Sequence, residues 1–249
     1  MADDRDWKSR LWWAGLWLGL ASLLVMLASG PGTRFGLWDF RLGLRLLALA
    51  ACGGLAAALA SLGLAAAALL SGRPKGRLAP ALAGLLLGAG LFLPPYLEYR
   101  KAMALPAIHD ISTDTEDPPA FVDVLPLRQR AHALNPSGYG GPAVAALQEK
   151  AYPDIRPLLL DLAPAKAFDR ALRVAWAMGW VVDGSDPARG RIEATATTLF
   201  FGFKDDVVIR VRPRGPGCRV DIRSVSRVGI GDVGTNARRV RRFLEAMKG

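Results

Sequence analysis

The sequence predicts an α+β fold: three N-terminal transmembrane helices followed by a two-layer domain with an antiparallel sheet and helices on one face. Long uncharged apolar runs fill the first part of the chain. Segments that alternate with a period of two follow later, flanked by amphipathic helical patterns. We therefore expect a membrane domain over residues 1–102, an extended lead-in over 103–138 and a soluble α+β domain over 139–249.

Composition narrows the class of protein. Of the 249 residues, 51% are hydrophobic, and only two are cysteines. These values exclude a disordered, collagen-like or disulfide-rich secreted chain. The net charge is +10, and residues 1–102 carry 11 basic against 5 acidic side chains. Basic residues that flank apolar runs are typical of membrane proteins, so nucleic acid is not an expected partner.

Three apolar runs are long enough to cross a bilayer, which requires about 20 residues. They cover about 11–29, 46–70 and 78–97, and the third contains Pro94 and Pro95 near its end. A partly re-entrant second run is the alternative. Small residues dominate the second run and predict close packing of the three helices against one another. No acidic residue lies inside a run, which argues against a transporter or pump.

Flanking charges predict the orientation, although the two sides are nearly balanced. One side carries six basic residues: Arg5, Lys8, Arg10, Arg73, Lys75 and Arg77. The other side carries five: Arg34, Arg41, Arg45, Arg100 and Lys101. Because three of the six lie within the short loop 71–77, we expect the N-terminus inside and the soluble domain outside.

The soluble domain begins with helical and extended segments. The pattern predicts a helix over 143–151, a short strand within 155–162 and an amphipathic helix over 164–178. A strand over 180–183 and a turn over 184–187 follow. Three alternating strands come next, with apolar sets around Ile192, Ile209 and Val220. The final helix, 235–248, places Val240 and Phe243 on its apolar face.

The lead-in carries an acidic motif. Asp110, Ser112 and Asp114 have the spacing that opens a calcium loop, but Thr115 stands where Gly is expected and Phe121 where Glu is expected. An EF-hand is therefore rejected. A looser divalent-cation site that adds His109 stays open, beside the simpler interpretation that these side chains cap turns.

Two further segments are candidate sites. Residues 199–206 place Phe201 and Phe203 around a glycine, as a lipid-contacting loop, a pocket mouth or part of the core. Residues 224–239 combine glycines with a helix start, which is suited to an anion. The alternative is that Asp232 or Thr235 caps that helix and that Arg227 pairs with Asp205 or Asp206. The polar face of the last helix is a possible phosphate surface, formed by Arg238, Arg239, Arg241, Arg242 and Lys248.

Together these segments resemble the domain of unknown function 1499 family over roughly residues 105–247. The motifs are 109–114 with Pro118 and Pro119, 201–206, and 224–229 with Asp232, Asn236 and Arg239. The membrane half is similar to the multi-span anchor of some bacterial members, and other members are secreted or lipid-anchored. The resemblance therefore implies an extracytoplasmic domain, and it implies no catalytic residue.

We predict a multi-pass protein of the bacterial inner membrane whose periplasmic domain binds a lipid or an envelope protein. It is expected to need no cofactor, and the chain offers no catalytic constellation with its two histidines. The alternative function is a divalent-metal-dependent hydrolase that uses the acidic segments. With the opposite topology, the domain would meet nucleic acid or acidic proteins. The candidate binding residues are Asp110, Asp114, Phe201, Phe203, Asp205, Asp206, Arg227, Asp232, Asn236 and Arg239.

Overall fold

The computed structural model describes residues 11–70 and 78–249. The chain divides into two compact units. One is built from Met1–Arg100 with Phe200–Gly202, and the other from Lys101–Leu199 with Phe203–Gly249. Each unit is described by itself below.

Three N-terminal helices are long and apolar enough to cross a membrane, as predicted. They are α2 (Ala14–Arg34), α3 (Phe40–Leu70) and α4 (Leu78–Ala104). Each extends beyond its predicted apolar run at one end. The basic residues that predict the orientation from the N-terminal tail and from loop 71–77 lie outside the described residues.

Helix α4 continues through Pro94 and Pro95 to Ala104, whereas the sequence predicts an end near residue 97. Proline removes one helical hydrogen bond but fixes φ at a helical value. In an apolar spanning segment, neighbouring helices and local adjustments make such prolines tolerable. Pro80 lies in the first turn of α4, where the missing N–H has no helical partner in any case.

Small residues allow the apolar helices to approach closely. A Cβ atom added at Gly88 of α4 would collide with the Gly54 carbonyl oxygen of α3, and one added at Gly15 of α2 would collide with Ser61 of α3. Such contacts are the way in which helices pack where lipid removes the hydrophobic driving force. The contacts agree with the predicted packing of the three helices within one chain.

The second unit is built on one six-stranded antiparallel sheet. Its strands are β1 (Asp110–Ser112), β2 (Leu158–Leu160), β3 (Val181–Asp186), β4 (Arg191–Thr197), β5 (Lys204–Arg214) and β6 (Gly217–Ser226). The order is β1-β6-β5-β4-β3, and β2 also pairs with β6. Both short strands therefore lie along one edge of β6, at Val225 for β1 and at Val220 for β2.

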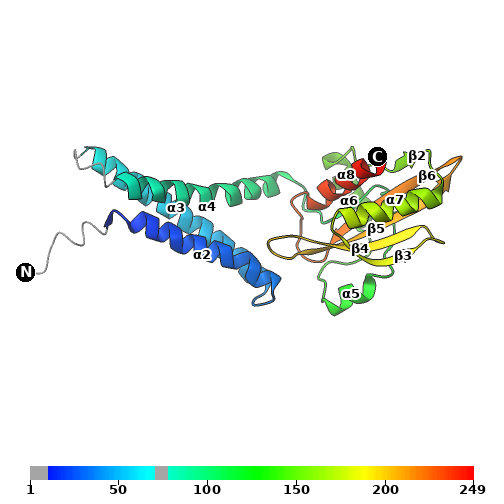
Figure 1. Cartoon of the computed structure of the whole chain (residues 1–249), viewed down its shortest axis with the longest axis horizontal. Coiled ribbons are helices and arrows are strands. Elements are labelled where there is room, and N and C mark those ends of the chain that lie inside the picture. Colours follow the sequence, from blue (N-terminus) through cyan, green and yellow to red (C-terminus); the bar gives the residue numbers. More distant parts are fainter. Residues whose placement is uncertain (1–10, 71–77) are drawn as a thin grey trace, which may run out of the picture. The chain divides into compact units, whose positions relative to one another are not determined.

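One face of the sheet is apolar and is covered by α7 (Pro164–Ala177) and α8 (Thr235–Lys248) (Figure 1). Val207 and Ile209 of β5 pack there with Phe168 of α7 and Phe243 of α8. Full burial of such a side chain contributes roughly 1.5–3 kcal/mol. The predicted two-layer α+β arrangement is confirmed. Helix α6 (Gly141–Ala151) adds Val144 to the same core.

The opposite, polar face of the sheet is covered by residues 113–139, which include α5 (Leu125–Arg130) (Figure 1). Phe121 and Val124 from this segment pack on Val208 and Val225 in a second, small core. The segment for which the sequence predicts an extended lead-in therefore shields the charged side chains of β5 and β6 from water. We call residues 113–139 the covering segment.

One predicted turn is wrong. Residues 184–186 belong to β3, which stays paired with β4 as far as Asp186 opposite Arg191. A register shift between Val182 and Gly184 accommodates the extra residue. A bulge of this kind lets the β3–β4 pairing continue through residues that are typical of turns, where the sequence suggests that the strand ends. The chain then reverses over residues 187–190, where Gly190 has φ +62°.

Candidate functional site

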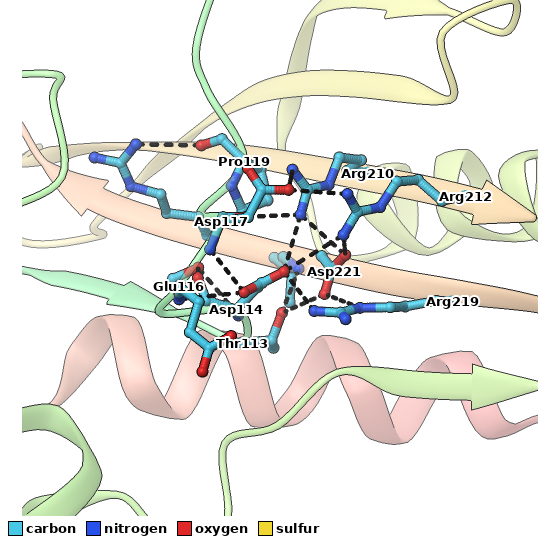
Figure 2. A network of polar contacts seen from close by, with 12 residues as sticks. Thr113, Asp114, Glu116, Asp117, Pro119, Arg210, Arg212, Arg219 and Asp221 are labelled. Atoms are coloured by element: carbon cyan, nitrogen blue, oxygen red, sulfur yellow. Dashed lines mark hydrogen bonds and ion pairs between the residues drawn. The ribbon is translucent and has the colours of Figure 1, made fainter. Parts of the chain in front are cut away.

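Charged side chains on the polar face of the sheet form a network beneath the covering segment (Figure 2). Asp114 from the covering segment accepts hydrogen bonds through Oδ2 from three arginines. The distances are 2.5 Å to Arg219 Nη2, 3.2 Å to Arg210 Nη2 and 3.4 Å to Arg212 Nη2. Figure 2 shows these arginines on β5 and β6, pointing toward Asp114.

Two further carboxylates complete this Arg–Asp network. Asp221 of β6 is fully buried and accepts from Arg210 at 3.2 Å, from Arg212 at 3.3 Å and from Arg219 at 3.0 Å. Asp117 accepts from Arg212 at 2.9 Å and from Arg210 at 3.1 Å. The hydrogen bond from Arg212 and the charge of Arg210 lower the pKa of Asp117. Three carboxylates thus balance three guanidinium groups and join the covering segment to the sheet.

Asp110 binds a different arginine. Its carboxylate accepts from Arg223 Nε at 2.9 Å and from Nη2 at 2.7 Å, a bidentate ion pair that is almost completely buried. The guanidinium lies near the rings of Phe121 and Tyr139, at 5.0 and 5.5 Å from their centres. Burial raises the pKa of Tyr139 to about 12. Arg223 therefore holds the start of β1 and the covering segment together.

Asp206 and Arg227 form another buried ion pair. This pair is one of the alternatives that the sequence left open, in which Arg227 binds Asp205 or Asp206. Arg227 Nη2 donates to Asp206 Oδ1 at 2.7 Å, and Arg128 of α5 donates to Oδ2 of the same carboxylate. The Thr195 hydroxyl links this pair to Asp183 of β3 at 2.6 Å. Because Asp206 is fully buried, the two arginines supply the charge that makes its ionised form tolerable.

Asp205 faces the helices on the other side of the sheet. It accepts a hydrogen bond from Arg239 of α8 at 2.6 Å. Arg239 also donates to Ser224 Oγ at 3.0 Å and to the side-chain oxygen of Asn236. Asn236 in turn donates to the His109 carbonyl at 3.0 Å, and so ties α8 to the residue just before β1.

Asp232 caps the first turn of α8 by accepting hydrogen bonds from its free backbone N–H groups. Its carboxylate accepts from the backbone N–H of Gly234 at 2.9 Å and of Asn236 at 2.5 Å. Burial raises the pKa of this carboxyl group. Of the two interpretations of this loop, the capping one is therefore correct. The amides on which an anion would depend are already bonded to Asp232.

The acidic candidates do not converge on a metal site. Among residues 11–70 and 78–249, no group of three or more His, Cys, Asp or Glu side chains is placed to hold a metal ion. Asp110 and Asp114 bind different arginines, and Asp205 and Asp206 lie on opposite faces of β5. His109 directs Nδ1 to the Ile230 carbonyl oxygen, 3.1 Å away.

The phenylalanine candidates lie in the β4–β5 hairpin. The backbone of Phe203 pairs with Thr198, through N–H···O bonds of 2.8 Å in both directions, one of them to the threonine hydroxyl. Phe201 makes an edge contact with Phe200, with ring centres 5.2 Å apart. Gly202 supplies the left-handed turn at φ +70°. These two candidates therefore belong to a closed hairpin and not to the charged clusters.

Sequence reasoning missed several residues of these clusters. They are Arg128, Glu193, Arg210, Arg212, Arg219, Asp221 and Arg223. Glu193 is fully buried and accepts backbone N–H bonds from Val122 at 2.8 Å and Val124 at 3.0 Å. Burial raises its pKa. The available signal was the period-two run of Arg and Asp on one face of β5 and β6.

Two basic cavities open at the end of the sheet where β4 ends and β5 begins. The α8 cavity, of about 340 Å³, lies on the helix side and is lined by Arg238, Arg239, Arg242, Thr197, Thr235 and Trp180 among others. The α5 cavity, of about 380 Å³, lies on the covered side and is lined by Arg130, Lys204, Arg227, Asp183, Thr195 and Thr197 among others. Each cavity has three basic side chains, and Thr197 borders both.

These features define a class: a protein with three helices of membrane-spanning length, and an α+β domain stabilised by buried Arg–Asp pairs. Within this class the chain belongs to the family described as protein of unknown function (DUF1499), whose model matches residues 110–247. The matched region runs from the first residue of β1 almost to the end of α8, so it covers the sheet and excludes α2, α3 and α4. No curated protein matches the sequence.

Proposed function

We propose that this chain is a membrane-anchored binding protein that displays its α+β domain on the periplasmic side of a bacterial inner membrane. There the domain binds a lipid or protein of the cell envelope. The observation that carries the proposal is the pair of basic cavities at one end of the sheet. Buried acidic side chains elsewhere in the domain are matched by arginines, which suits a rigid binding scaffold.

The orientation rests on flanking charges. Arg73, Lys75 and Arg77 are concentrated in a loop of seven residues, which favours the cytoplasm for that loop and the opposite side for the C-terminal domain. Alkaline phosphatase and, separately, a fluorescent protein that is active only in the cytoplasm are fused after Gly249. Phosphatase activity supports the periplasmic domain. Fluorescence from the second fusion overturns the orientation and favours the nucleic-acid alternative.

The envelope role is tested through the α5 cavity. Arg130→Glu with Lys204→Glu reverses two charges at its rim, while Arg214→Glu reverses one at the far end of β5. Each variant is expressed in cells that lack the native chain, and sensitivity to detergent is measured. We expect the α5-cavity variant to fail in restoring resistance and Arg214→Glu to succeed. Full restoration by the cavity variant, at equal membrane abundance, contradicts the role of this end of the domain.

A further inference from the structure

We propose that the α8 cavity binds a phosphoryl group, carried by a lipid headgroup or by free phosphate. This inference deepens the proposed binding function, because it names a site and a ligand chemistry. The cavity volume of about 340 Å³ falls within the range of roughly 300–1,000 Å³ that is typical of small-molecule sites.

The charge of the cavity favours an anion. Its lining contains three arginines and, among the described residues, no acidic side chain. Arg239 is balanced by Asp205, but neither Arg238 nor Arg242 has an ion-pair partner within residues 11–70 and 78–249. Arg241, which lies between them in the sequence, is paired with Asp154 outside the cavity. The α5 cavity differs, because Asp183 is part of its lining.

Two of the three guanidinium groups are held in place before any ligand arrives. Arg239 has a side chain that is 9% exposed and is fixed by Asp205 and Ser224, at 2.6 and 3.0 Å. Arg238 donates to the Val233 carbonyl at 2.9 Å and to the Thr235 hydroxyl at 3.0 Å. Each guanidinium has five N–H donors, so donors stay available for phosphate oxygens. Groups that are already ordered lose little entropy on binding.

The remaining wall suits a phosphate that carries an organic substituent. Met178, Trp180 and Ala196 add apolar side chains to the lining, beside the arginines of α8. The Trp180 ring stacks on Phe243, with ring centres 5.9 Å apart, and is thereby held in position. The hydroxyl groups of Thr197 and Thr235 supply further polar contacts. A phosphate ester fits a lining with both basic and apolar side chains better than a bare inorganic ion does.

The test is calorimetric titration of the full-length chain in a neutral detergent and phosphate-free buffer. The probes are a short-chain phosphatidylglycerol and inorganic phosphate. The cavity variant is Arg238→Gln with Arg242→Gln, and the matched control is Arg214→Gln at the far end of β5, since all three side chains are exposed. We expect one phosphatidylglycerol to bind per chain, at least tenfold more weakly in the cavity variant and within twofold of wild type in the control.

The two probes distinguish the two sources. Binding of phosphatidylglycerol alone, with loss in the cavity variant, assigns the site to lipid. Binding of inorganic phosphate with the same loss assigns it to a soluble phosphate. Binding that the cavity variant leaves unchanged, or no binding of either probe, overturns the phosphate site. None of these results depends on the fusions at Gly249, so the proposed orientation fails or succeeds separately.

Discussion

Asp205 and Asp206 are adjacent in β5, yet their carboxylates bind arginines on opposite faces of the sheet. Asp205 bonds Arg239 on the helix side, and Asp206 bonds Arg227 beneath the covering segment. Alternation along a strand requires this separation. The pair therefore cannot act as two carboxylates on one cation, and each has a separate effect on stability.

Asp206→Asn leaves Arg128 and Arg227 buried without an opposing charge. Removal of one partner from a buried pair typically costs about 3–5 kcal/mol. We expect a loss of this size in the free energy of unfolding, measured by urea titration of the full-length chain in detergent. The control is Asp154→Asn, whose pair with Arg241 is exposed and should cost less than about 1 kcal/mol. Equal losses of unfolding free energy in both variants would contradict the conclusion that burial makes the Asp206 pair the more important one for stability.

Asp114 has two separable tasks. Its Oδ2 accepts from three arginines, whereas its Oδ1 accepts from the backbone N–H of Glu116 and Asp117 at 3.3 and 3.0 Å. We expect Asp114→Asn to preserve the turn but weaken the network, and Asp114→Ala to lose both. Hydrogen exchange of amides 113–119 should therefore increase in the order wild type, Asn, Ala. Equal exchange in wild type and Asp114→Asn would show that the charge does not hold the segment.

Asp117 makes the free energy of unfolding depend on pH in the acidic range. Its pKa lies below the ordinary value of 3.8, because Arg212 and Arg210 stabilise the carboxylate in the folded chain. The unfolded chain binds the proton more readily, so the stabilisation is complete above pH 3.8 and is lost as pH falls through the lower folded-state pKa. Asp117→Asn should flatten the fall in the unfolding temperature as pH decreases below 3.8. An unchanged slope would exclude this contribution.

Gly190 should not accept a side chain. Its φ is +62°, and an added Cβ would collide with the Val211 carbonyl oxygen, part of the rigid β5 backbone. Gly179 has φ +75°, but open space surrounds the added atom. Left-handed strain alone costs about 1 kcal/mol. We expect Gly179→Ala to lower the free energy of unfolding by that amount and Gly190→Ala to lower it clearly more, as measured by thermal unfolding. Similar losses would contradict the collision.

Local patterns predicted much of the fold. Length and apolarity identified α2, α3 and α4, and the alternation of Val207, Ile209 and Val211 identified the inner face of β5. The helix α7 followed from its apolar stripe. The end of β3 was not predicted, because a bulge carries the ladder through Gly184, a residue that ordinarily signals a turn.

The charge clusters were predicted only in part. Arg227 directly follows β6, and Asp206 lies 21 residues earlier on the neighbouring strand β5, so hairpin topology brings them together. Asp114 and Arg219 are separated by 105 residues, and Arg223 and Asp110 by 113. The covering segment has no hydrophobic period that would indicate which surface it covers. Its position depends on long-range ion pairs, which local sequence patterns do not specify.

The bidentate clamp between Asp110 and Arg223 has a mechanical consequence. The chain leaves α4, passes through residues 105–109 and enters the sheet at β1. A pull on these linking residues therefore meets the hydrogen bonds of His109 and then the clamp at Asp110 before it reaches the covering segment. That load passes to the long strand β6, opposite Val225, and not to the free edge at β3. The covering segment follows Asp110 in the chain. Force from a moving membrane would therefore be borne by the clamp before it reached the Arg–Asp network.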